Sequence, residues 1–126
     1  WLGGTDELVV PVITNTTVVI RSVCAQTQQY LRQLDSFVSQ SKRGQIKDAK
    51  WLTRLNIVSI NVKLIALARR CHFLIEVNAQ KKFAFSIEFI QTQLFLAKRP
   101  CLLRQATYRF LNLLSFYLQH FYLFQP

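Results

Sequence analysis

The chain has 126 residues, of which 51% are hydrophobic and 13% aromatic, so a disordered chain is excluded and one folded domain is favoured. Sixteen Lys and Arg residues against six Asp and Glu residues give a formal net charge of +10. This imbalance favours an anionic partner, which could be nucleic acid, an acidic protein surface or an anionic membrane.

The N-terminal segment differs in composition from the remainder of the chain. Residues 1–14 hold two of the three glycines and one of the three prolines, and we expect an extended arm there. Residues 15–126 then form a single helical domain, in which Asn15 or Thr16 could provide the first N-cap. Apolar residues at intervals of one, three and four positions predict the first helix at about 16–41.

Three further helices follow from the remaining glycine and proline positions. Gly44 separates the first helix from the second, which we place at about 46–76. A third helix is predicted at about 82–98, because one helix spanning residues 46–98 would be about 80 Å long. Pro100 ends the third helix, and the fourth is predicted at about 101–123.

The third predicted helix has an ambiguous pattern. Phe83, Phe85, Ile87 and Phe89 alternate as they would in a strand, yet the same segment also fits a helix. A lone strand has no partner for its backbone groups, so we predict a helix, which Asn78 could cap.

Four helices with short connections favour an all-α, up-down four-helix bundle. The alternative is a pair of stacked helical hairpins cut from an α-solenoid, although no internal repeat is visible.

No pattern of titratable residues points to catalysis, and we expect no enzyme, cofactor or metal. The acidic residues are dispersed, and no glycine-rich phosphate-binding loop is present. Cys71 and His72 are neighbours in sequence, but adjacent helical residues point in different directions. Three widely spaced cysteines, Cys24, Cys71 and Cys101, do not make a disulfide framework, and buried thiols in a reducing compartment are favoured.

Basic residues are concentrated near two of the expected helix connections. In an up-down bundle these two connections lie at the same end, and we predict a cationic surface that binds an acidic partner. Solubilising charge around two turns is the alternative. The candidate residues are Lys42, Arg43, Lys47, Lys50, Arg54, Lys98, Arg99 and Arg104.

The last seventeen residues carry no formal charge and are rich in aromatic side chains. They are too short and too polar for a membrane span, but they suit a helix–helix interface. Most of them would line the bundle core, whereas Phe116, Tyr122 and Phe124 fall partly off the core stripe. We predict that these three form a protein interface.

The leading functional hypothesis is therefore a non-catalytic helical module for protein interaction and complex assembly, acting as a scaffold or an oligomer. The alternatives are a nucleic-acid-binding module and a peripheral binder of anionic membranes. We expect an intracellular location, nuclear or cytoplasmic. The chain starts at Trp1 and contains no methionine, so we expect a fragment of a longer protein or a processed form.

Overall fold

The computed structural model describes the backbone of residues 3–42 and 50–123 and the side chains of residues 16–40 and 56–120. Within these ranges the backbone forms four helices and no strand. The helices are α1 (Gly3–Lys42), α2 (Lys50–Val77), α3 (Lys81–Leu96) and α4 (Pro100–Leu123). The ambiguous third segment is helical, which confirms that prediction.

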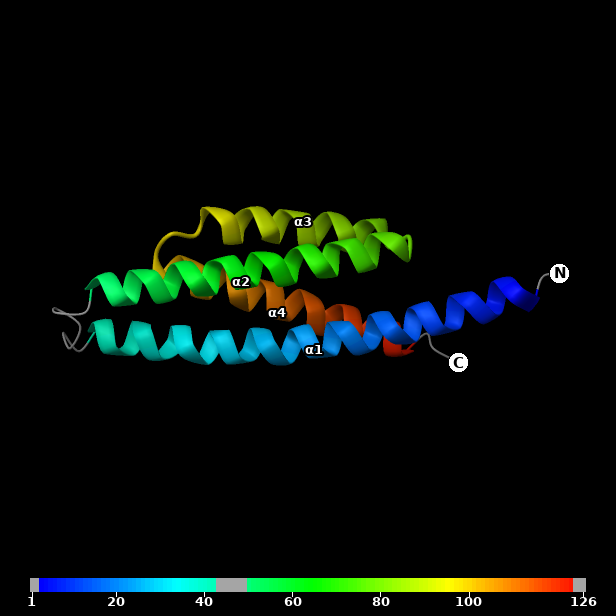
Figure 1. The fold of residues 1–126 in the computed structure, drawn as a ribbon, viewed down its shortest axis with the longest axis horizontal. Coiled ribbons are helices and arrows are strands. Elements are labelled where there is room, and N and C mark those ends of the chain that lie inside the picture. The colour runs from blue at the N-terminus through cyan, green and yellow to red at the C-terminus, as the bar shows by residue number, and fades with distance from the viewer. Residues whose placement is uncertain (1–2, 43–49, 124–126) are drawn as a thin grey trace.

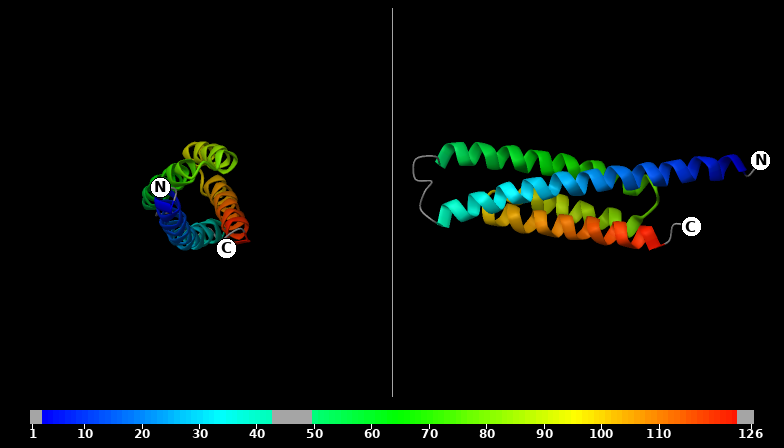
Figure 2. Two further views of the ribbon diagram at one scale, coloured as in Figure 1. Left: turned by 90° about the vertical axis from the view of Figure 1, so that its right-hand side faces the viewer. Right: turned by 90° about the horizontal axis from the view of Figure 1, so that it is seen from below.

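The four helices form an up-down bundle (Figure 1). Helix α1 packs on α2 and α4, and α3 packs on α2 and α4, so neighbours in the chain are neighbours in space. Viewed along the bundle, the helices surround a common centre (Figure 2). The contact between α1 and α4 closes this ring, and closure favours a bundle over hairpins stacked in an open row.

One apolar stripe from each helix builds the core. Buried side chains recur every three or four residues, as helical periodicity requires. The largest fully buried side chains include Tyr117, Phe110, Ile20, Leu34, Leu64, Ile75, Ile87, Leu94, Leu103 and Leu114. Two threonines in the core, Thr27 and Thr107, bond their hydroxyls to the backbone carbonyls of Val23 and Leu103, four residues earlier.

The extended N-terminal arm expected over residues 1–14 is wrong, since α1 already begins at Gly3. A proline inside a helix removes one backbone hydrogen bond and can bend the helix, but helix can continue on both sides of it. Pro11 therefore does not mark a boundary. Thr16 does not lie at the start of a helix and is instead a buried residue inside α1. Figure 1 shows that the N-terminal part of α1 runs beyond the ends of the other helices.

The α2–α3 turn lies where a break was predicted, but it is built differently. Ala79 has a φ of 60°, and the N–H groups of Ala79 and Gln80 donate to the carbonyls of Glu76 and Ile75. This pattern is a Schellman motif that ends α2. Asn78 does not cap α3. Its amide donates to Thr16 Oγ1 at 2.9 Å and to the Leu74 carbonyl at 3.0 Å, and so ties the turn to α1.

A second asparagine holds the C-terminal end of α3. The side-chain amide of Asn61, on α2, donates to the carbonyls of Leu94 at 2.6 Å and Ala97 at 3.1 Å. The last carbonyls of a helix have no partners within the helix, so Asn61 acts as a C-terminal cap supplied by a neighbouring helix. This contact fixes the level along α2 at which α3 ends.

Candidate functional site

Helix α3 carries apolar side chains on two opposite sides. Ala84, Ile87, Ile90 and Leu94 are buried in the core. Phe85, Phe89 and Leu96 follow at intervals of four and seven residues, so they share a second stripe on the far side of the helix. They are 73%, 60% and 64% exposed, and we call them the outer face of α3. A helix that is apolar on both sides is normally buried on both sides.

A groove runs between α3 and α4 beside this outer face. It consists of two adjoining hollows of about 360 and 220 Å³, and both are bordered by Gln93 and Arg109. The first lies towards the start of α3 and is lined by Phe85, Ser86, Phe89, Ile90, Gln93, Arg109 and Leu113. The second lies at the end of α3 and is lined by Gln93, Leu96, Ala97, Leu102, Gln105, Ala106 and Arg109.

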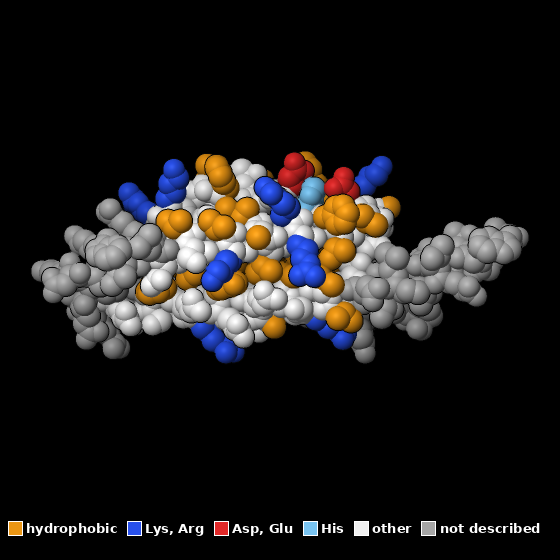
Figure 3. All heavy atoms as spheres, viewed as in Figure 1, with side chains coloured by type: hydrophobic (Ala, Val, Ile, Leu, Met, Phe, Trp, Pro, Cys, Tyr) orange, Lys and Arg blue, Asp and Glu red, His pale blue; other side chains and the backbone are white. Residues whose placement is uncertain are grey.

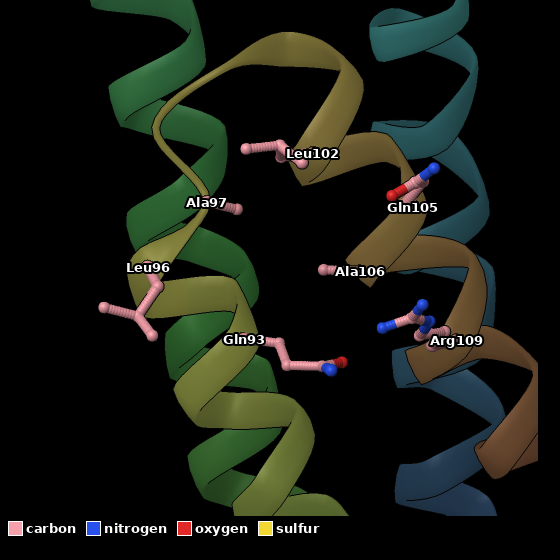
Figure 4. A pocket seen from close by; sticks show the side chains of 7 residues that line it. All are labelled: Gln93, Leu96, Ala97, Leu102, Gln105, Ala106 and Arg109. Atoms are coloured by element: carbon pink, nitrogen blue, oxygen red, sulfur yellow. The ribbon is translucent and has the colours of Figure 1, made fainter.

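Two polar side chains point into this groove from its opposite walls (Figure 4). Figure 4 shows Gln93, from α3, and Arg109, from α4, pointing into the gap between the two helices from opposite sides. The Oε1 atom of Gln93 is shielded from solvent and has no hydrogen-bond partner among the described residues. The groove thus combines apolar walls with one cation and one unsatisfied acceptor, as ligand-binding surfaces often do.

No acidic residue lines the groove, and exposed cations lie on the two helices that form it. Lys98 and Arg99 are exposed just beyond the C-terminal end of α3, and Lys81 and Lys82 are exposed at its start. The charges around the groove therefore favour an anionic ligand. On the opposite side of the bundle, Figure 3 shows apolar side chains interspersed with many Lys and Arg groups and few acids.

The described backbone of the predicted cations lies at two levels along the bundle. Lys98 and Arg99 lie in the α3–α4 connection, which Asn61 holds against α2. Lys50 precedes Asn61 by eleven residues, or about 16 Å along a helix axis. In Figure 2 the end of α1 and the start of α2 lie at the same end of the bundle as the α3–α4 connection, and they project further.

The structure describes only some of the eight predicted cations. Arg43 and Lys47 lie outside the described residues, and only the backbone of Lys42, Lys50 and Arg54 is described. Arg104 is half-buried and lies 3.6 Å from the Asp35 carboxylate on α1. An acid from another helix thus partly neutralises Arg104, which the sequence pattern did not reveal.

Of the predicted aromatic interface, only Phe116 has a described side chain. It is 58% exposed, but its ring stacks on His120 at 5.9 Å and lies 5.9 Å from Phe83. Phe83 also meets Tyr117 edge to face at 5.0 Å. Phe116 therefore borders an aromatic cluster that joins α3 to α4. The Tyr122 side chain and all of Phe124 lie outside the described residues.

The thiols show no sign of activation. All three cysteines are free. Burial, with a smaller effect from Cys24 nearby, raises the pKa of Cys71 to about 12, although Arg70 acts in the opposite direction. Burial also raises the pKa of Cys24 to about 11. A reactive cysteine has a lowered pKa, whereas the burial of Cys71 stabilises its neutral thiol. His72, the neighbour of Cys71 in the sequence, lies 3.9 Å from the Glu76 carboxylate.

The described part of the chain contains neither a candidate metal site nor a candidate membrane span. No group of three His, Cys, Asp or Glu side chains there is arranged to hold a metal ion. None of the helices, over the same part, has the combined length and apolarity needed to cross a membrane.

Comparisons with protein-family models, with curated proteins and with solved structures found no match to this chain.

Sequence reasoning missed the outer face of α3 and the groove beside it. The signal was present in the double pattern of residues 83–98, in which strand-like alternation and helical spacing overlap. Phenylalanines on both sides of a helix produce that overlap. Once the segment is known to be helical, its alternation indicates a second apolar face.

Proposed function

We propose that the chain is a non-catalytic helical module that binds another protein through the outer face of α3 and the adjoining groove. The observation that carries this proposal is the exposure of Phe85, Phe89 and Leu96 along one stripe, each by 60% or more. Large apolar side chains in one continuous row beside a groove are typical of protein-binding surfaces.

The energetic argument rests on the amount of apolar surface. Burying one large apolar side chain contributes about 1.5–3 kcal/mol, so three such residues can supply much of the free energy of a specific complex. The bundle core already holds α3 through Ile87 and Leu94, which are almost completely buried. The outer face is therefore available without disturbing the fold.

The cations contribute to the same function in this proposal. Lys98 and Arg99 extend the site with positive charge beyond the end of α3, and they would steer an acidic partner towards it. Free thiols, including the exposed Cys101, suit a reducing intracellular compartment as the setting. Nucleic acid and anionic membranes remain alternative ligands of the basic surface.

The proposal is tested by affinity capture of partners with the tagged chain, followed by mass spectrometry. We expect captured proteins to be lost when the outer face is changed by Phe85→Glu and Phe89→Glu together. The matched control is Val18→Glu with Val58→Glu, two side chains that are each 59% exposed on α1 and α2. This control introduces the same charge and should retain the captured proteins.

Circular dichroism must show that both double variants remain helical and melt like the wild type. Capture of the same proteins by the wild type and by the Phe85→Glu, Phe89→Glu variant would contradict the proposal. Capture that requires nucleic acid and is abolished by nuclease would point instead to the basic surface.

A further inference from the structure

We propose that the α3–α4 groove receives an acidic amphipathic helix of a different protein, with one of its carboxylates paired to Arg109. This inference rests on the proposed function and adds the chemical class of the partner. It is carried by the shape of the groove and the charges in and around it.

The shape of the groove suits a helix. Phe85 and Leu96, the outermost lining residues of α3, are eleven residues apart, or about 16 Å, which is about three helical turns. The two hollows lie one after the other along this length. A docked helix with apolar side chains at positions i, i+4 and i+7 would place one or more of them in each hollow, as in other helix-in-groove complexes.

The charges indicate an acidic partner. Arg109 borders both hollows, and no carboxylate lines either of them. Glu88 is the acid of α3, and it is not part of the groove lining. An apolar docked helix would desolvate the guanidinium of Arg109, and a carboxylate on that helix would offset the cost with a charge-assisted hydrogen bond.

The same charges disfavour a second copy of this chain. A symmetric dimer places the same surface patch on both subunits, so Arg109 and its cationic surroundings would face their own copies. Each chain carries a formal charge of +10, and the pair would meet with strong repulsion.

The shape of the groove also favours a protein partner over a lipid surface. A membrane would cover the projecting rings of Phe85 and Phe89, but it presents no regularly spaced side chains to the two hollows between α3 and α4. A docked helix presents such side chains along one face. We therefore assign the groove to a peptide helix.

The first experiment is a selection from a display library of random 18-residue peptides on the wild-type chain. Binders that also bind the Phe85→Glu, Phe89→Glu variant are removed. We expect the remaining peptides to carry net negative charge and apolar residues at i, i+4 and i+7, and to become helical on binding. Basic peptides, peptides without this periodicity, or no enriched peptide would overturn the inference.

The second experiment measures binding of the most enriched peptide, labelled with a fluorophore, by anisotropy. We expect Arg109→Glu to weaken binding by about tenfold or more, whereas the peptide with its acids changed to lysine should regain affinity for this variant. The matched control is Arg32→Glu, an exposed cation of α1, the helix that does not contact α3. It changes the net charge equally and should change affinity less than twofold.

These results separate the two proposals. Partner capture can depend on Phe85 and Phe89 while the Arg109→Glu variant binds the acidic peptide as tightly as the wild type. In that case the inference of an acidic partner helix is wrong, but the proposed protein-binding surface is supported. If capture is independent of Phe85 and Phe89, the proposed function fails. Flotation with phosphatidylserine vesicles that is lost in the Phe85→Glu, Phe89→Glu variant would assign the outer face to lipid and overturn this inference.

Discussion

At the scale of single residues, two asparagines connect parts of the bundle that are far apart in sequence. Asn78 joins the α2–α3 turn to α1, and Asn61 joins the end of α3 to the middle of α2. Each contact satisfies polar groups at a helix end, which would otherwise require water or another partner. These side chains set where the helices lie along one another, because apolar packing alone permits sliding.

Replacing Asn61 tests its role at the end of α3. Asn61→Asp puts a carboxylate against two carbonyl oxygens, and we expect it to lower the free energy of unfolding by about 2–3 kcal/mol. Asn61→Ala should cost less, about 1 kcal/mol. Urea denaturation measures both changes. Asn112→Asp, an exposed position of α4, serves as the control and should stay within about 0.5 kcal/mol of the wild type.

The raised pKa of Cys71 predicts how the free energy of unfolding depends on pH. Its thiol keeps its proton up to about pH 12 in the folded chain, against a reference pKa of 9.0. Between these values the unfolded state binds fewer protons, so the free energy of unfolding must fall as the pH rises. The decline from this group is at most about 1.4 kcal/mol per pH unit.

Urea denaturation at pH 8 to 11 should therefore show a shallower decline for Cys71→Ala than for the wild type. The absolute stability of Cys71→Ala will also be lower, so the slopes are compared and not the values. Parallel profiles for Cys71→Ala and the wild type would contradict the raised pKa.

At the scale of elements, α3 carries a second apolar side that is exposed. Its inner stripe lies in the core, whereas its outer stripe has no covering helix among the described residues. Its ends depend on other elements, since Gln80 makes no side-chain cap at its start and Asn61 holds its end. Helix α3 therefore takes its position from α2 and α4 and presents its second face outward.

Two substitutions on α3 test which face is buried. Ile87→Ala creates a cavity in the core and should cost about 2–5 kcal/mol in the free energy of unfolding. Phe85→Ala, two residues away and 73% exposed, should cost less than about 1 kcal/mol. Chemical denaturation compares them directly, and similar costs at the two positions would show that Phe85 is packed within the fold.

The α2–α3 turn offers a stabilising substitution. Ala79 adopts a φ of 60°, where a side chain clashes with the backbone and glycine does not. Glycine is the common residue at this position of a Schellman motif. Ala79→Gly should therefore raise the free energy of unfolding by about 0.5–1 kcal/mol in urea denaturation. Ala66→Gly, in the interior of α2, should instead lower it by about 1 kcal/mol.

At the scale of the whole molecule, the surplus of positive charge opposes compaction. The ion pair between Arg104 and Asp35 is partly exposed, and such pairs contribute only about 0–1 kcal/mol. Both residues of this pair are already counted in the formal net charge of +10, so the pair leaves that charge unchanged. Repulsion among the remaining cations therefore destabilises the bundle at low ionic strength, and an acidic partner would relieve it.

This repulsion should be visible in salt dependence. We expect the melting temperature to rise by several degrees between about 10 and 300 mM NaCl, because salt screens like charges. A variant with Arg69→Gln and Lys98→Gln, two exposed cations, should show a smaller rise. Calorimetry or circular dichroism measures both profiles. A melting temperature that falls with salt would mean that attractive pairs dominate the surface.

The sequence by itself determined that the chain forms four helices, where their breaks lie to within a few residues, and that they pack as an up-down bundle. These features follow from local signals: apolar periodicity, scarce glycine and proline, and charge. The N-terminal boundary of the first helix was predicted wrongly. A proline does not always end a helix, and α1 continues through Pro11.

Only the tertiary structure decided which surplus apolar side chains stay uncovered and which charges meet. Periodicity describes one helix at a time, so it marks Phe85 and Phe89 as apolar without stating that no neighbouring helix covers them. The pairing of Arg104 with Asp35, and the convergence of Gln93 and Arg109, join residues from different helices. Such contacts depend on the rotation and level of each helix, which packing across the whole bundle sets.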